Sequence, residues 1–338
     1  MKKLISFICV LAMVLALAAC GSSAPAAATK APAASTEAPA EDVSADKTFV
    51  VGICQLVQHP ALDAATQGFK DALTEALGDK VTFQEQNASG DSATCSLICN
   101  QFVSDEVDLI MANATASIQA AASATNTIPI LGTSITDYGV ALGVDNWTGV
   151  SGTNISGTSD LAPLDGQAAM IQALFPDAKT IGLLYCSGEP NSIFQADSME
   201  ALLTDMGYSV ERYTFADSND VSSVTANACS NSDVLYIPTD NTAASCTEAI
   251  NNVALSAGIP IVAGEEGIAS GCGAATLSIS YYDLGRATGE MAAEILTEGA
   301  DISTMEVRFA PAFTKEYNAD ICEALNITVP EDYVAIAK

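Results

Sequence analysis

Residues 49–73 read FVVGICQLVQHPALDAATQGFKDAL, and this stretch decides how the rest of the chain is interpreted. Phe49–Cys54 is mostly apolar and has the length and Val/Ile content of a buried strand. A polar turn, Gln55–His59, follows, and Pro60 stands where a helix tolerates its missing N–H. Apolar residues then recur three or four positions apart, at Leu62, Ala65, Phe69, Leu73 and Leu77. The stretch predicts a strand, a polar loop and a helix, and open α/β sheets bind ligands at such loops.

The chain begins with a segment that we exclude from the fold. Lys2 and Lys3 precede an apolar run that ends in Leu-Ala-Ala-Cys20. This layout is typical of a secretory signal, and its last four residues resemble a bacterial lipobox. We therefore expect a signal peptide over residues 1–19 and lipidation of Cys20, and a location on the extracytoplasmic face of the cell membrane. A plain signal peptide or a membrane helix is the alternative, although the run is short for a span.

Residues 20–47 predict a disordered tether that carries the lipidated Cys20. They are rich in Ala, Pro, Ser and Thr and show no apolar periodicity. About 290 residues remain, enough for one large α/β unit or two lobes. The full chain has 12 basic and 41 acidic residues. Such an acidic surface would repel phosphates, so we expect no nucleic-acid partner.

The eight cysteines beyond residue 20 are scattered along the chain: Cys54, Cys95, Cys99, Cys186, Cys229, Cys246, Cys272 and Cys322. Cys95 and Cys99 are one helical turn apart, which is a poor geometry for a disulfide. His59 is the only histidine, and no metal-finger spacing is present, so we expect no metal site. We favour buried thiols, and an exported disulfide framework stays open as the alternative.

The pattern of the opening stretch returns about 130 residues later, which indicates an internal repeat. Thr180–Tyr185 reads as a strand, a polar loop with Pro190 follows, and Ser192–Met206 reads as a helix. Later elements match in the same order, ending with Ile-Pro-Ile at 259–261 and at 128–130. The repeat predicts an α/β protein of two similar lobes, each with its own parallel sheet. Extra elements after residue 273 suggest that the chain crosses back between them.

Six motifs resemble the ABC transporter substrate-binding lipoproteins of the tryptophan/tyrosine-binding type. They are GICQLVQHPALDAATQGFKDAL, FVSDEVDLIMANAT, NISGTSDLAP, LYIPTDNT, GIPIVAGEEG and YYDLGRATGEMAAEIL. The resemblance implies a type I periplasmic-binding-protein fold with two Rossmann-like lobes and a three-crossover hinge. We place lobe 1 at residues 48–160 plus about 279–308, and lobe 2 at 161–278 plus about 309–338.

The carboxyl-end loops of both sheets are expected to face a ligand cleft. Lobe 1 would contribute Gln55, His59, Thr115, Ala116, Thr133, Ser134, Thr136 and Asp137. Lobe 2 would contribute Ser187, Asn191, Asp240, Asn241, Thr242, Glu265 and Glu266. Aromatic partners for a ring would come from Tyr281, Tyr138, Trp147, Tyr185 or Phe194.

A zwitterionic amino acid needs opposite partners at its two ends. Thr115 and Thr133–Ser134 suit its carboxylate, and Glu265, Asp240 or Asp137 suits its ammonium. Several of these residues have a second interpretation. Thr115 and Thr242 could only cap helices, Asp240 could bind turn amides, and Glu265 and Glu266 could form a surface turn. His59 could cap its helix or face the cleft, and Asp160 is expected at a crossover.

An enzyme is the rival class, but the sequence has no Gly-x-Ser-x-Gly elbow, Walker loop or His-Glu-x-x-His motif. We expect no catalytic residue and no cofactor. The resemblance implies the binding component of an ABC importer, a monomer that captures an aromatic amino acid and delivers it to a permease with its ATPase. A surface sensor for another small polar ligand, a branched-chain amino acid or a sugar, is the alternative.

Overall fold

The structure is a computed structural model that describes residues 47–310 and 312–337. The expected signal peptide, the lipidation site Cys20 and residues 20–46 of the expected tether lie outside this range. The described residues belong to one compact unit. None of the helices among them is long and apolar enough to cross a membrane.

Lobe 1 is built on a sheet with the strand order β11-β5-β4-β3-β1-β2, all of whose pairings are parallel. Its strands are β1 (Phe49–Gln55), β2 (Val81–Asn87), β3 (Leu109–Asn113), β4 (Ile130–Ile135), β5 (Ile155–Ser159) and β11 (Arg308–Phe309). Its helices are α1 (Pro60–Leu77), η1 (Gly78–Lys80), α2 (Ser92–Ser104), α3 (Thr115–Ala124), α4 (Tyr138–Leu142), α11 (Tyr281–Glu298) and η2 (Ile302–Thr304). The strand, loop and helix predicted for residues 49–73 are confirmed, and Pro60 begins the helix.

Lobe 2 is built on a sheet with the order β13-β12-β10-β9-β8-β6-β7. Its strands are β6 (Thr180–Cys186), β7 (Ser209–Phe215), β8 (Val234–Ile237), β9 (Ile261–Ala263), β10 (Ala275–Ser278), β12 (Thr314–Tyr317) and β13 (Val334–Ala335). Its helices are α5 (Leu164–Leu174), α6 (Pro190–Asp205), α7 (Val221–Asn231), α8 (Asn241–Ser245), α9 (Thr247–Ala257), α10 (Glu266–Gly271) and α12 (Ala319–Ala324).

The internal repeat is visible in the two strand orders. Lobe 1 contains β2-β1-β3-β4-β5, and lobe 2 contains β7-β6-β8-β9-β10 in the matching order. In each lobe the first strand lies between the second and the third, so the strand order reverses there. Ligands of open α/β sheets bind at the carboxyl ends of strands beside such a reversal. Two strands depart from the expected parallel pattern, because β12 runs antiparallel to β10 and β13 pairs parallel to β12.

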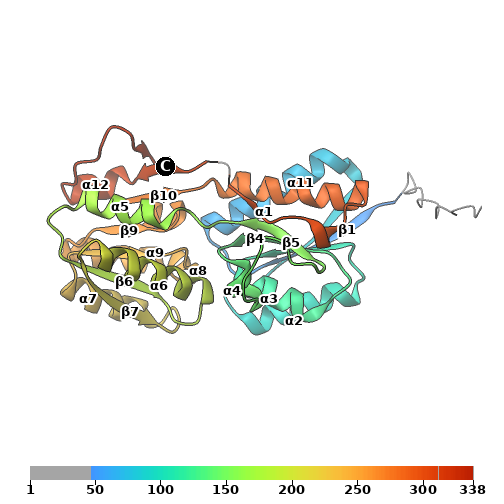
Figure 1. The fold of residues 1–338 in the computed structure, drawn as a ribbon, viewed down its shortest axis with the longest axis horizontal. Coiled ribbons are helices and arrows are strands. Elements are labelled where there is room, and N and C mark those ends of the chain that lie inside the picture. The colour runs from blue at the N-terminus through green and yellow to red at the C-terminus, as the bar shows by residue number, and fades with distance from the viewer. Residues whose placement is uncertain (1–46, 311, 338) are drawn as a thin grey trace, which may run out of the picture. The chain divides into compact units, whose positions relative to one another are not determined.

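The chain passes between the lobes three times within the described unit (Figure 1). It leaves β5 for α5, returns from β10 to α11, and leaves β11 for β12. The returning helix α11 lies alongside α1 on lobe 1. Its Met291 packs with Phe69 and Leu73 of α1 in the core of that lobe. The third passage carries the C-terminal segment back to lobe 2.

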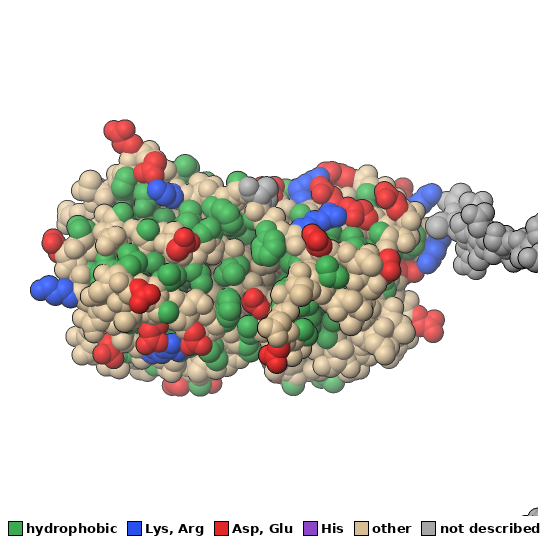
Figure 2. All heavy atoms as spheres, viewed as in Figure 1, with side chains coloured by type: hydrophobic (Ala, Val, Ile, Leu, Met, Phe, Trp, Pro, Cys, Tyr) green, Lys and Arg blue, Asp and Glu red, His purple; other side chains and the backbone are tan. Residues whose placement is uncertain are grey.

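The loop between Ile135 and Asp160 contains two elements that the sequence did not predict, α4 and β5. Strand β4 also extends to Ile135 and therefore includes Thr133 and Ser134. Both lobes carry acidic side chains over the face shown in Figure 2. This distribution agrees with the excess of acidic residues in the sequence.

Candidate functional site

A chamber lies between the lobes, at the carboxyl ends of the strands of both sheets. Twelve residues line it. Ser134 comes from the end of β4, and the others come from loops or helices that follow β1, β4, β5 and β10 in lobe 1 and β6, β8 and β9 in lobe 2. They are His59, Leu62, Ser134, Thr136, Asp160, Tyr281, Asn191, Thr239, Asp240, Asn241, Ala244 and Glu265. Most are polar and nearly all are buried. The chamber therefore offers hydrogen-bonding groups from both lobes to whatever it encloses.

Eight of the sixteen predicted ligand residues lie in this chamber: His59, Ser134, Thr136, Asn191, Asp240, Asn241, Glu265 and Tyr281. Whether any of them contacts a ligand stays a prediction. Sequence reasoning missed four lining residues, Leu62, Thr239, Ala244 and Asp160. Asp160 lies on a crossover, as expected, and also lines the chamber.

The other eight predicted residues do not line the chamber. Gln55, Thr115 and Thr133 are buried within lobe 1, Asp137 caps α4, and Ser187 is exposed. Ala116 and Thr242 line a second cavity of about 340 Å³ between the lobes, which shares Asn241 with the chamber. Glu266 lines a third cavity, together with Pro60 and Ile336. The structure therefore divides the predicted set among several places.

Direct contacts between the lobes close the chamber. The hydroxyls of Thr136 and Thr239 lie 3.2 Å apart. Gln195 donates to Thr239 Oγ1 over 2.5 Å and approaches Thr136 Oγ1 at 3.5 Å. The cavity left inside has a volume of about 10 Å³, roughly the space that one water molecule needs. In this closed arrangement the two lobes contact one another directly.

His59 is the N-cap residue of α1, but its side chain makes no capping bond. Its Nε2 lies 3.3 Å from Oδ1 of Asn241 in the other lobe, and its Nδ1 is buried without a hydrogen-bond partner among the described residues. Burial lowers the pKa of His59 below its ordinary value. The structure therefore favours the cleft over the cap as the place of this imidazole.

Glu189 fixes the orientation of Asn241. Its carboxylate accepts hydrogen bonds from Nδ2 of Asn241 at 2.7 Å and from the backbone N–H at 3.0 Å. It also accepts from Thr242, through N–H and hydroxyl, both at 2.8 Å. Because the amide NH₂ of Asn241 faces Glu189, its Oδ1 faces His59 and must accept. His59 therefore donates from Nε2, and its bare Nδ1 is an acceptor.

Two buried carboxyls of the chamber serve as helix caps. Asp240 accepts from N–H of Ala243 in α8 and from N–H of Cys186 at the end of β6. Burial, followed by the charge of Glu189, raises its pKa to about 8. Glu265 accepts from the first N–H groups of α10 and has its pKa raised to about 7, again chiefly by burial. The alternative interpretation that Asp240 binds local turn amides is confirmed for Ala243, whereas Cys186 belongs to another element, β6.

The third buried carboxyl, Asp160, joins two crossovers. Its Oδ2 accepts from the Tyr281 hydroxyl at 2.8 Å. Asp160 follows β5 on the first passage between lobes, and Tyr281 begins α11 after the second. Burial raises the pKa of Asp160. Of the aromatic candidates, Tyr281 lines the chamber, whereas Tyr138 and Trp147 stack on each other at 5.7 Å in lobe 1.

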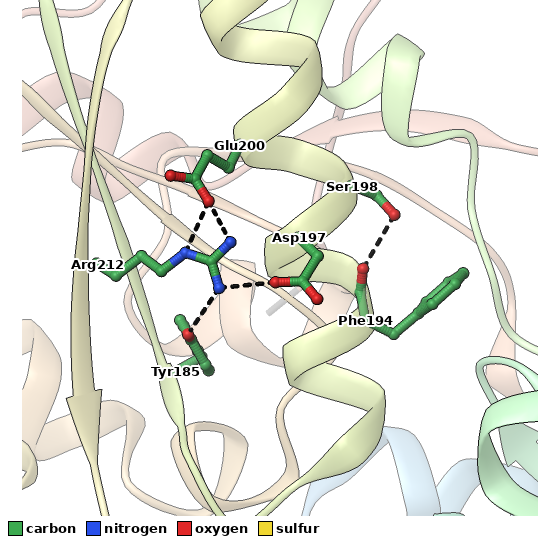
Figure 3. Close-up of polar contacts among 6 residues, drawn as sticks. All are labelled: Tyr185, Phe194, Asp197, Ser198, Glu200 and Arg212. Atoms are coloured by element: carbon green, nitrogen blue, oxygen red, sulfur yellow. Dashed lines mark hydrogen bonds and ion pairs between the residues drawn. The ribbon is translucent and has the colours of Figure 1, made fainter. Parts of the chain in front are cut away.

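Helix α6 supplies Asn191 and Gln195 and is held to the sheet by Arg212 of β7 (Figure 3). The guanidinium donates to Asp197 at 2.7 Å and to Glu200 at 2.8 Å, both on the helix. It also donates to the hydroxyl of Tyr185 on β6 at 3.4 Å. These bonds fix the side of α6 that lies away from the chamber.

The cysteines form no site for a metal. All eight are free thiols among the described residues, and seven of them are buried. No cluster of three or more His, Cys, Asp or Glu that could hold a metal ion is found in that part of the chain. Buried thiols are therefore what the structure contains, as the sequence favoured.

Two Rossmann-like lobes with three crossovers and a closed chamber between them define a two-lobed binding protein, of the type I periplasmic-binding-protein fold. The sequence profile described as ABC transporter substrate binding protein matches residues 50–338, and the chain belongs to this family. A curated relative, the tyrosine-binding protein of Clostridioides difficile (strain R20291), is 38% identical over 280 residues, which are 82% of this chain and 81% of the relative.

Two solved structures extend the comparison. The ABC domain from Streptococcus pneumonia in complex with L-Trp is 32% identical, with a TM-score of 0.80 over 84% of this chain and 97% of that one. The ligand-free, open structure of a substrate-binding protein with adhesive properties from Clostridium difficile is 37% identical, with a TM-score of 0.66 over 86% and 99%. The family and the curated relative are both described as binding proteins.

Proposed function

We propose that this protein captures an aromatic amino acid between its lobes and delivers it, as the lipid-anchored binding component of an ABC importer, to a membrane permease with its ATPase. The observation that carries the proposal is the chamber at the carboxyl ends of both sheets, lined by polar groups of both lobes. The ligand class is supported by two relatives, one named for tyrosine and one in complex with L-Trp.

Capture works by closure about the three crossovers. A ligand that contacts both lobes stabilises the closed form over the open one by its differential affinity. The chamber is enclosed by contacts between the lobes, so the lobes must separate before a ligand enters. Breaking the bonds of His59 with Asn241 and of Thr136 with Thr239 accompanies that separation.

The comparisons support a closed arrangement. The L-Trp complex has the lower sequence identity of the two structures, yet it superposes better than the ligand-free, open structure. Sequence distance alone would give the opposite order. We infer that the lobes of this chain are closer together than those of the ligand-free, open structure.

The ligand assignment is tested by thermal unfolding of the purified full chain with L-Tyr, L-Trp or L-Phe, with L-Leu and D-glucose as the other arms. Binding stabilises the folded form by about 2.7 kcal/mol at a ligand concentration 100 times Kd. A midpoint that rises with one aromatic amino acid supports the proposal. A flat response to all three contradicts it, and a rise with L-Leu or glucose points to the sensor of another polar ligand.

The anchor is tested separately in cells of a bacterial host. The lipobox-like residues before Cys20 support export and lipidation. We expect a labelled fatty acid to be attached to the wild-type chain and not to the Cys20→Ala variant. The wild-type chain should be found in the membrane fraction, and we expect it to be a monomer. Label retained in the variant would exclude this site of lipidation.

A further inference from the structure

We propose that Asp160 holds the ammonium group of the ligand and that Ser134 donates to its carboxylate, an assignment that rests on the proposed function. Asp160 Oδ1 is buried and has no hydrogen-bond partner among the described residues. The other oxygen is held by Tyr281, so the carboxyl group is fixed in place. A fixed carboxyl with a free oxygen in a chamber is a ready acceptor for an N–H donor.

The other acids of the chamber are less free to bind a ligand. Both oxygens of Asp240 accept backbone N–H groups, of Cys186 and of Ala243. Both oxygens of Glu265 accept N–H groups at the start of α10. Moving either carboxyl toward a ligand would leave buried N–H groups unpaired, which costs about 1–3 kcal/mol for each group. Asp160 can bind without such a loss.

The charge of the chamber also favours a cationic group. Three of its lining residues are acids, and none is Lys or Arg. The ion pairs among the described residues involve side chains at the surface. A buried carboxylate without a counter-ion is costly, and burial raises the pKa of Asp160 accordingly. A ligand ammonium supplies the missing positive charge.

Ser134 lies on the strand next to Asp160. The backbone N–H of Asp160 donates to the carbonyl of Ile135 at 3.2 Å, which brings the ends of β4 and β5 together. Ser134 Oγ is buried without a partner in the described chain, and its φ of 56° is unusual for a residue with a side chain. Strained residues of this kind cluster at ligand sites. Because no Lys or Arg lines the chamber, this neutral hydroxyl is a donor that a ligand carboxylate can use.

His59 Nδ1 is the third unpartnered polar atom of the chamber. Because the tautomer that donates to Asn241 leaves Nδ1 bare, this atom can only accept. The chamber thus presents an acid oxygen, a bare imidazole nitrogen and one hydroxyl. This set matches the head group of an α-amino acid, which brings N–H donors and a carboxylate close together.

The test compares three ligands by calorimetry on the purified full chain. They are L-Tyr or L-Trp, whichever the wild type binds, the matched amine (tyramine or tryptamine), and the matched acid without an amino group. We expect Asp160→Asn, which keeps the shape, to weaken binding of the amino acid and the amine about 10- to 100-fold and to spare the acid. We expect Ser134→Ala to weaken the amino acid and the acid about 5- to 10-fold and to spare the amine.

Asp137→Asn is the matched control, because Asp137 lies close in sequence but caps α4 outside the chamber. It should leave the affinity for the amino acid within about twofold of wild type. Melting without ligand adds a second measurement. Asp160→Asn keeps an acceptor for the Tyr281 hydroxyl and removes a buried carboxyl that has no counter-ion, so it should not lower the midpoint. A purely structural role would lower that midpoint and weaken all three ligands alike, which would overturn the assignment.

The outcomes separate this inference from the proposed function. If the wild type binds none of L-Tyr, L-Trp and L-Phe, both the proposed function and the assignment of Asp160 and Ser134 are wrong. If it binds one of them and Asp160→Asn binds it equally well, only the assignment of Asp160 falls. If Asp160→Asn does not fold, the Ser134→Ala variant tests the orientation of the ligand. Weaker binding of the amino acid and the acid, with unchanged binding of the amine, supports the proposed orientation. Weaker binding of the amine alone would contradict it.

Discussion

The Nε2 atom of His59 in lobe 1 lies 3.3 Å from Oδ1 of Asn241 in lobe 2. This pair joins the loop after β1 to the start of α8 and closes one side of the chamber. The imidazole must carry a proton on Nε2, because Asn241 presents an oxygen, and burial, which lowers its pKa, favours the neutral form. Protonating His59 would add a buried positive charge to the chamber.

The stability of the protein should therefore depend on pH through His59. Burial lowers its pKa in the folded state, so at acid pH the unfolded chain binds a proton that the folded one resists. The contribution is present above the ordinary pKa of about 6.5 and is lost as pH falls below it. Relative to His59→Gln, the wild type should lose up to about 1.4 kcal/mol of unfolding free energy per pH unit there.

Urea unfolding at several pH values between 8 and 5 would measure this difference. Asp240 and Glu265 are the same in both proteins, so their own titration cancels in the comparison. Curves that stay parallel from pH 8 to pH 5 would show that His59 titrates alike in the folded and unfolded states.

Glu265 should have the opposite pH dependence. Burial raises its pKa from 4.5 to about 7, so the folded state holds the proton more tightly than the unfolded one. The stability that this provides is present below pH 4.5 and is lost as pH rises to about 7. The Glu265→Gln variant should lack this pH dependence. The difference in unfolding free energy between wild type and this variant should therefore become smaller between pH 5 and pH 8.

Glu265→Ala should cost about 1 kcal/mol more than Glu265→Gln, since it also removes the cap of α10. Chemical unfolding of the two variants at both pH values separates the cap from the charge. Equal deficits for Gln and Ala would mean that the two N–H groups of Gly267 and Ile268 do not need this cap.

The fold was largely predictable from sequence because its strands are apolar runs bounded by polar loops. Val51 and Ile53 of β1 are fully buried, and such runs identify a parallel sheet covered on both faces. Strand β5 was missed because its sequence, ISGTS, is mainly small and polar. Its hydroxyls are paired instead: Thr158 lies 2.8 Å from Thr288, and Ser159 donates to the carbonyl of Thr136.

The site was predictable only in part. Half of the ligand residues predicted from loops after strands lie in the chamber, because the carboxyl ends of parallel strands meet at one edge of a sheet. The sequence could not show which of the acidic residues cap helices. Asp240 and Glu265 stand at the starts of helices of five and six residues, too short to recognise from periodicity. The sequence predicts Asp160 only as a crossover residue, because its pattern does not reveal β5 directly before it.

The hydroxyl pair between the lobes should be energetically coupled. Thr136 Oγ1 and Thr239 Oγ1 lie 3.2 Å apart, and both are buried. Thr136→Val and Thr239→Val should each lower stability, and the double variant should lose less than the sum by about 0.5–1 kcal/mol. Thr225 offers a control, since its hydroxyl bonds only within α7, to the carbonyl of Val221. Thr136→Val with Thr225→Val should be additive, and additivity in both pairs would show that the lobes do not meet here in solution.

The packing of α11 on α1 should tolerate no side chain at Gly285. A Cβ there would lie 2.0 Å from the carbonyl oxygen of Ala65, and a backbone atom cannot rotate away. Alanine favours a helix over glycine by about 1 kcal/mol, but forcing the two helices apart costs more. Gly285→Ala should therefore lower the free energy of unfolding by about 3 kcal/mol and shift Tyr281, which begins the same helix.

Gly188→Ala is the matched control, because the nearest atom to its Cβ is Cys186 Sγ at 3.7 Å, and it should change stability by less than about 0.5 kcal/mol. Denaturant titration of the two variants measures both effects. A Gly285→Ala protein as stable as wild type would mean that α1 and α11 do not touch backbone to backbone, and that the chamber wall they carry is held by other contacts.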